Sequence, residues 1–183
     1  MKITGGQACG RFIAVPSIHG VRPTGSKMRQ SLFNILGKRT QQAEILDLFA
    51  GSGLIGFEAL SRGAGSLTCV EKNMVCARCL EINAQRLRYQ DKIKIIRDDF
   101  RRALARLTGQ QFDIIFADPP YKSDFAQQVL HLVAENKLLH PKGILIIEHK
   151  KNTMLDALES KLSLIECRPY SLSAFSFFAM AKD

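Results

Sequence analysis

Four consecutive residues, Asp118-Pro119-Pro120-Tyr121, combine a carboxylate, two rigid backbone positions and an aromatic ring. Each proline fixes its own φ angle and pushes the preceding residue towards extended geometry, so the loop is stiff. Such a loop can aim the Asp118 carboxylate and the Pro119 carbonyl at one point. Two acceptors at one point suit the exocyclic amine of a nucleobase, because they hold its N–H groups and stabilise positive charge developing on nitrogen. Tyr121 is then expected to stack on the base.

A glycine-rich segment is the second chemical feature. Gly51, Gly53 and Gly56 follow a short apolar stretch and open an expected helix, and such glycines let the backbone turn tightly beside a ligand. Their spacing also fits a dinucleotide-binding fingerprint, so the glycines alone do not identify the ligand. Asp47, four residues before Gly51, discriminates: a carboxylate there is awkward beside a pyrophosphate but suits a ligand with an ammonium and a sulfonium.

Further acids follow the next two expected strands. Glu71 comes 20 residues after Gly51, where an acid accepts hydrogen bonds from ribose hydroxyls. Asp98 or Asp99 is then placed to accept from an adenine amino group. Together these acids predict a pocket for S-adenosylmethionine, whose methyl group the amine would receive, leaving S-adenosylhomocysteine. A structural glycine turn or a nicotinamide dinucleotide site explains the acid series less well. The residues expected to contact this cofactor are Asp47, Phe49, Ala50, Gly51, Gly53, Glu71, Lys72, Asp99 and Phe100.

Alternating strands and helices are expected to position these groups. Continuously apolar strands separated by amphipathic helices predict a parallel sheet covered on both faces. A last pair of strand-like stretches, residues 163–167 and 175–180, predicts an antiparallel hairpin at one edge. The other expected strands are residues 44–50, 66–70, 92–97, 112–117 and 143–148, and the expected helices are residues 54–62, 73–88, 101–107, 124–136 and 153–162.

The N-terminal part of the chain has a different character. The chain carries 26 Lys and Arg against 17 Asp and Glu, a formal net charge of +9, yet the first acid is Glu44. Short strands around Gly5-Gly6 and a helix near residues 25–37 are expected here. We therefore divide the 183 residues into a basic extension, 1–40, and a catalytic domain, 41–183. A cationic segment of this kind favours a nucleic-acid partner over a merely soluble surface.

The motifs together resemble those of the bacterial small-subunit (16S) ribosomal RNA guanine-N2-methyltransferases, the RsmD type. The resemblance rests on residues 47–53, 70–73 and 118–121, and on an N-terminal signature of Arg22-Pro23-Thr24 and residues 28–36. It implies a Rossmann-like class I S-adenosylmethionine-dependent methyltransferase fold, with a mostly parallel seven-stranded sheet, an antiparallel C-terminal edge strand and an N-terminal hairpin and helix. It also implies methyl transfer to N2 of one guanine, with a small-subunit particle as substrate.

The same resemblance directs attention to residues that seat the RNA. Arg11, Arg22, Thr24 and Arg29 are the residues expected to contact it. The stretch Gly25-Ser26-Lys27 departs from the polar-acidic-basic pattern usual in the family, which concerns RNA contact and leaves the reaction type unaffected. An amino-directed DNA methyltransferase shares the tetrapeptide but needs a target-recognition region for which this length leaves little room. A non-catalytic RNA-binding assembly factor is the alternative outside enzymes.

Composition narrows the class of protein further. Hydrophobic residues make up 46% and charged residues 23% of the chain, as in globular domains. No apolar run reaches the ~18 residues of a membrane span, and the first residues lack the apolar core of a secretory signal. Five cysteines without framework spacing suit a reducing cytoplasm. Cys76-x-x-Cys79 lacks a second ligand pair and falls in an expected helix, so we expect no metal. We also expect the protein to be a monomer.

Overall fold

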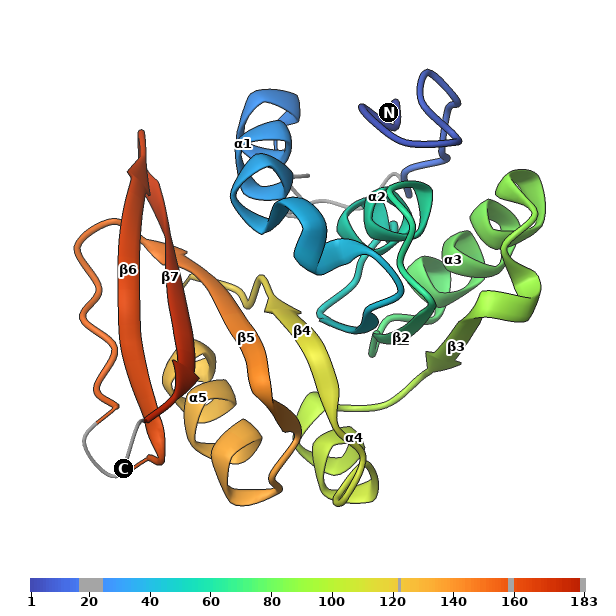
Figure 1. The fold of residues 1–183 in the computed structure, drawn as a ribbon. Coiled ribbons are helices and arrows are strands. Elements are labelled where there is room, and N and C mark those ends of the chain that lie inside the picture. The colour runs from blue at the N-terminus through green and yellow to red at the C-terminus, as the bar shows by residue number, and fades with distance from the viewer. Residues whose placement is uncertain (17–24, 122, 158–159, 182–183) are drawn as a thin grey trace.

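A computed structural model describes residues 1–16, 25–121, 123–157 and 160–181. Its centre is one seven-stranded sheet in the order β3-β2-β1-β4-β5-β7-β6 (Figure 1). The strands are β1 (Glu44–Leu48), β2 (Ser66–Val70), β3 (Ile93–Ile96), β4 (Phe112–Ala117), β5 (Leu139–Lys150), β6 (Leu162–Tyr170) and β7 (Ser173–Met180). The helices are α1 (Ser26–Leu36), α2 (Leu54–Ser61), α3 (Met74–Leu87), α4 (Phe100–Arg106) and α5 (Phe125–Glu135), with short 3-10 turns at Gly37–Thr40 and Gln90–Lys92.

Strand direction follows the predicted pattern. Strands β1 to β5 pair in parallel, and β7 runs antiparallel to both β5 and β6. The C-terminal hairpin predicted at one edge is therefore confirmed, as is the mostly parallel Rossmann-like sheet. Within that hairpin β7 lies inside and β6 forms the edge of the sheet.

Two helical layers cover the sheet. Helices α1, α2 and α3 lie on one face, while α4 and α5 lie on the other (Figure 1). Successive residues of a strand point to opposite faces, so Ile45 joins the buried cluster beneath α1 to α3 and Leu46 joins the cluster beneath α4 and α5. Both faces of the central strands are apolar for this reason. Within the described parts of the chain, no helix is long and apolar enough to cross a bilayer.

One predicted element is wrong. The helix expected over residues 153–162 does not form, because the described residues 151–157 are irregular and β6 already begins at Leu162. The Gln127 side chain of α5 takes the place of helical hydrogen bonds: it accepts from the Asp156 backbone N–H at 2.9 Å and donates to the Asp156 carbonyl at 2.6 Å. Met154, which a packed helix would cover, is 94% exposed.

The basic extension packs against the catalytic fold. The short strands expected around Gly5-Gly6 do not form; a single antiparallel bridge between Lys2 and Phe12 closes a hairpin-like loop there. Ile3 and Ile13 enter the same buried cluster as the residues beneath α1 to α3. Gly6 has φ +77° and lies so close to the Ser61 carbonyl that a Cβ would collide with it. The extension thus shares the core of the catalytic fold, and its division from that fold as a functional unit stays a prediction.

Candidate active site

Three carboxylates lie in a row across the carboxyl ends of β1, β4 and β5. Asp47 is level with Phe116 of β4, and Ala117 is level with Ile147 of β5, so Asp118 and Glu148 follow side by side on strands ~5 Å apart. Residues two before each acid, Ile45, Phe116 and Ile146, all pack beneath α1 to α3. Because side chains two apart share a face, the three acids point to that same face.

The first acid, Asp47, is almost fully enclosed. It is 2% exposed, and its Oδ2 accepts a hydrogen bond from the Gly56 backbone N–H at 3.1 Å. Burial raises the pKa of Asp47 to about 7, the Gly56 hydrogen bond opposes that rise, and the charge of Glu71 adds to it. A buried carboxylate in such surroundings gains stability when a cation comes near.

The glycine loop joins Asp47 to Glu71. Gly53 has φ +77° at the start of α2, and a Cβ there would lie 2.5 Å from a Leu80 methyl carbon. The Gly51 N–H donates to Glu71 Oε2 at 2.8 Å, while the Asn73 N–H donates to Oε1 at 2.7 Å. Glu71 therefore connects the loop after β1 to the turn after β2, and the predicted neighbourhood of these groups is present.

The third part of the predicted cofactor site lies after β3. Lys72 Nζ is 3.6 Å from Asp99 Oδ2, which brings two of the predicted cofactor residues together. Both acids also pair with arginines of α4: Asp99 with Arg101, and Asp98 with Arg102 and Arg106. The Arg102 hydrogen bond lowers the pKa of Asp98. The contact with Lys72 links Asp99 to the predicted site, and which of the two acids faces a ligand stays a prediction.

An aromatic cluster closes this part of the sheet. The rings of Phe49 and Phe100 lie 4.9 Å apart between centroids, and Phe125 lies 5.2 Å from Phe100. Phe100 is 3% exposed whereas Phe49 is only partly buried. Phe49 therefore offers more side-chain surface to a ligand than Phe100 does, and the buried Phe100 ring packs against the Phe49 ring.

The tetrapeptide follows β4 and contacts β5. Tyr121 is 44% exposed, and its hydroxyl donates to Glu148 Oε1 at 2.8 Å. Asp118 is partly buried, and desolvation raises its pKa well above the ordinary value, with the charges of Glu148 and Asp47 acting in the same direction. Burial likewise raises the pKa of Tyr121, and Glu148 strengthens the effect. The acids at this edge consequently favour a positively charged ligand and N–H donors.

Sequence reasoning missed two polar residues that organise this region. Glu148 ends an apolar strand, and Asn83 interrupts the apolar face of α3; a buried polar residue at such a position is the available signal. The Asn83 amide donates to the Ala14 and Ser52 carbonyls at 2.9 and 3.0 Å and accepts from the Ala14 N–H at 2.8 Å. Asn83 thus ties the extension to the glycine loop.

The residues predicted to bind RNA separate into three kinds. Arg22 and Thr24 lie outside the described residues. Arg11 is exposed, and its guanidinium donates to the Arg86 and Leu87 carbonyls at the end of α3, so it holds the extension in place. Its RNA contact stays a prediction.

Arg29 is buried. It is 1% exposed, lies 3.4 Å from Glu58 Oε2 and donates to the Lys2 carbonyl at 2.8 Å. Burial lowers the pKa of Arg29, and the charge of Glu58 opposes this. The structure therefore does not support the predicted RNA contact of Arg29, because its guanidinium already neutralises a buried carboxylate and has no surface to offer a phosphate.

Potential metal ligands do not gather in the described parts of the chain, where no group of three or more His, Cys, Asp or Glu side chains is arranged to hold an ion. Cys76 and Cys79 are both buried in α3. Burial raises the pKa of Cys76 to about 11, which opposes thiolate formation. Both side chains lie in the interior, and the Cys79 thiol donates to the Ala14 carbonyl at 3.2 Å.

Known proteins share both the sequence and the fold. A family model described as "Conserved hypothetical protein 95" matches residues 1–179. Ribosomal RNA small subunit methyltransferase D of Haemophilus influenzae is 36% identical over 85% of this chain and 81% of its own length. This chain belongs to that methyltransferase family. A putative rRNA methyltransferase of Bacillus subtilis, YlbH, is 31% identical over 97% of this chain and 98% of its own length.

The family relationship extends to three dimensions. The structure of yhhF, a putative methyltransferase from Escherichia coli, superposes with a TM-score of 0.87 and 29% identity. The match covers 100% of this chain and 99% of the other. The resemblance inferred from the motifs is thus confirmed at the level of the family and of the methyltransferase fold.

Proposed function

We propose that this chain transfers a methyl group from S-adenosylmethionine to the exocyclic N2 amine of a guanine in small-subunit (16S) ribosomal RNA. Membership of the methyltransferase family supports rRNA methyltransferase activity. The observation that carries the finer proposal is the row of Asp47, Asp118 and Glu148 beside the glycine loop, because it combines a cation site with acceptors for an amine.

The residues at the glycine loop fit this methyl donor. S-adenosylmethionine supplies an electrophilic methyl group on a positively charged sulfur, next to an ammonium and a ribose. Asp47 offers the buried negative charge, and the Glu71 carboxylate stands where it would accept hydrogen bonds from a ribose diol, as it now accepts one from the Gly51 N–H. A side chain at Gly53 would collide with Leu80 and Phe57, so glycine is needed for the tight turn of this loop. Phe49 and Asp99 would border the adenine.

Asp118 and the Pro119 carbonyl act on the amine. They accept its two N–H hydrogens and favour a more tetrahedral nitrogen, whose lone pair is then less delocalised into the ring. Attack of this nitrogen on the methyl carbon forms the N–C bond while the electrons of the C–S bond stay with sulfur. The nitrogen then loses its extra proton to the Asp118 carboxylate, whose raised pKa suits a proton acceptor. Tyr121 stacks on the base.

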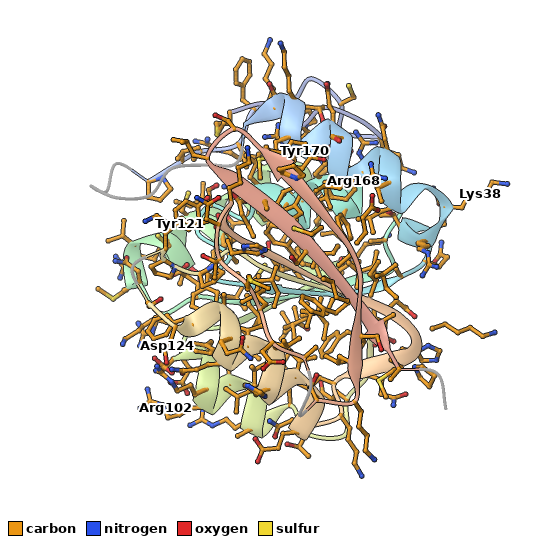
Figure 2. All side chains as sticks on the ribbon, turned by 90° about the vertical axis from the view of Figure 1, so that its left-hand side faces the viewer. Lys38, Arg102, Tyr121, Asp124, Arg168 and Tyr170 are labelled. Carbon is orange, nitrogen blue, oxygen red and sulfur yellow. The ribbon has the colours of Figure 1, made fainter. Side chains whose placement is uncertain are left out.

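The proposed partner is ribosomal RNA in an assembled or assembling small subunit. This protein binds it as a monomer. Lys2, Lys27 and Lys38 are exposed on the described part of the extension, where no acid stands. Cationic side chains there attract phosphates and release counterions. The extension reaches the glycine loop through Asn83, and Met28 of α1 contacts Ser173 next to Tyr121. RNA held near Lys27 would therefore lie beside the catalytic edge, whereas Lys38 lies on the other side of the molecule from Tyr121 (Figure 2).

Methyl transfer from radiolabelled S-adenosylmethionine tests the proposal. Small subunits from a strain lacking this protein should accept label, and mass spectrometry of the digested RNA should yield N2-methylguanosine. Asp118→Ala should abolish transfer while cofactor affinity, measured by calorimetry, stays within about twofold. Unchanged turnover in that variant would refute the mechanism. Label appearing instead in duplex DNA would support an amino-directed DNA methyltransferase, and cofactor binding without transfer to either would support an assembly factor.

A further inference from the structure

Glu148 is the one acid in the row that the reaction described above leaves without a task. It is 5% exposed near the carboxyl end of β5, where it follows Ile147 just as Asp118 follows Ala117. The two carboxylates therefore lie side by side on the same face of the sheet, and the charge of Glu148 adds to the burial that raises the pKa of Asp118. Keeping two such acids together is costly in the free protein, which indicates a function that needs both.

The tetrapeptide holds Glu148 in a defined orientation. The Tyr121 hydroxyl donates to Oε1 at 2.8 Å and also meets the Ser173 hydroxyl at the start of β7. Ser173 in turn contacts the Met28 sulfur of α1 at 3.8 Å. Figure 2 shows Tyr121 and Tyr170 from the side of β6 and β7. A second contact joins this hairpin to α1, because the Tyr170 hydroxyl lies 2.7 Å from the Ser31 hydroxyl. The Tyr121 ring, which is predicted to stack on the base, and the Glu148 carboxylate are thus held together by this hydrogen bond.

Neighbouring carboxylates match one nucleobase better than the others. Guanine presents two adjacent donors, the N2 amine and the N1–H. In adenine and cytosine the amine stands beside a ring nitrogen that accepts hydrogen bonds. An acceptor that faces a carboxylate is repelled, whereas a donor gains a charge-assisted hydrogen bond. A site with an acid for the amine and a second acid next to it therefore discriminates by donor pattern.

We propose that Glu148 is the specificity-determining residue of this site: its carboxylate accepts the guanine N1–H while Asp118 and the Pro119 carbonyl hold the N2 amine. This inference rests on the proposed function, since it concerns the same base in the same site. It assigns Tyr121 a second role, because its hydroxyl positions the carboxylate that reads the base while its ring stacks on that base. Adenine and cytosine are rejected at this position by their ring-nitrogen lone pair.

The test replaces the N1–H of the substrate and the charge of Glu148 in turn. Small subunits are reassembled with RNA carrying either guanosine or 2-aminopurine riboside at the methylated position. 2-Aminopurine keeps the N2 amine but has an acceptor at N1. The wild-type enzyme should prefer guanosine strongly in kcat/KM. Glu148→Gln, whose amide can either donate or accept, should lower that preference about 10- to 100-fold, as expected for loss of a charge-assisted base contact.

Two variants guard the interpretation. Glu166→Gln alters an acid of β6 that pairs with Arg168, and it should leave the preference unchanged. Tyr121→Phe keeps the aromatic ring and leaves the Glu148 carboxylate in place, but removes the hydroxyl that positions it. It should therefore lower the preference for guanosine less than Glu148→Gln does. It also supplies a second readout if Glu148→Gln fails to fold, in which case an unchanged preference in Tyr121→Phe overturns the inference.

The outcomes separate this inference from the proposed function. Equal losses of kcat/KM on both substrates in Glu148→Gln would show that the residue only supports the fold, and would overturn the inference while the proposed function stands. Equal wild-type rates on both substrates would do the same. Failure of the wild-type enzyme to methylate guanosine particles would overturn the proposed function and this inference together.

Discussion

Replacing Asp47 with asparagine should make the ligand-free protein more stable while weakening its binding of S-adenosylmethionine. The substitution keeps the shape and an acceptor for the Gly56 N–H, which lies 3.1 Å from Oδ2. It removes a charge from a side chain that is 2% exposed. A buried charge at this site lowers the free energy of unfolding, and the substitution measures the size of that loss.

The magnitude follows from the pKa. Burial raises the pKa of Asp47 from 3.8 to about 7, so the folded state prefers the protonated acid. The stability that this group contributes is complete below pH 4 and is lost as the pH rises through about 7. The loss amounts to about 4 kcal/mol at pH 8 and about 2 kcal/mol at pH 5, at 1.36 kcal/mol per pH unit. The asparagine accepts a weaker hydrogen bond from the Gly56 N–H than the carboxylate does, which reduces the expected gain in stability by about 1 kcal/mol.

The assay is urea unfolding of both proteins at each pH. Asp47→Asn should raise the free energy of unfolding by about 3 kcal/mol at pH 8 and by about 1 kcal/mol at pH 5. Asp91→Asn, on an exposed 3-10 turn, serves as the control and should change it by less than about 0.5 kcal/mol. Calorimetry with S-adenosylmethionine should show at least about tenfold weaker binding. A destabilised variant, or a gain that is the same at both pH values, would refute the reasoning.

Three further variants examine how the extension is held and what it binds. Glu58→Ala removes the carboxylate that pairs with buried Arg29 and accepts from Thr4, so it should lower the free energy of unfolding by about 3–5 kcal/mol; a loss below about 1 kcal/mol would contradict the burial argument. Asn83→Ala removes three hydrogen bonds to backbone groups and should speed proteolytic cleavage of the extension, whereas unchanged cleavage would show that Asn83 does not secure it. Lys27→Gln with Lys38→Gln should weaken RNA binding and reduce the salt slope by up to about 2, and an identical slope in filter-binding titrations would place the RNA elsewhere.

The motifs were predictable because local geometry determines their surroundings. Gly53 needs a positive φ, and Asp118 follows an apolar strand, so the order of residues alone places both at the carboxyl end of a parallel sheet. The strands and most helices follow from hydrophobic periodicity for the same reason. The helix expected over residues 153–162 does not form, and Gln127, which is distant in sequence, instead hydrogen-bonds the Asp156 backbone in this segment.

Charge was the least reliable guide to position. Arg29 and Arg11 look alike in the sequence, yet one neutralises Glu58 in the interior and the other caps α3 at the surface. Glu148 carries no local motif and gains its meaning only from the strand beside it. The sequence by itself determined the family, the glycine loop and the tetrapeptide, because these depend on residues close along the chain. Only the tertiary structure decided which charges face each other, because the pairing of β4 with β5 and of α1 with α2 joins residues about 30 positions apart.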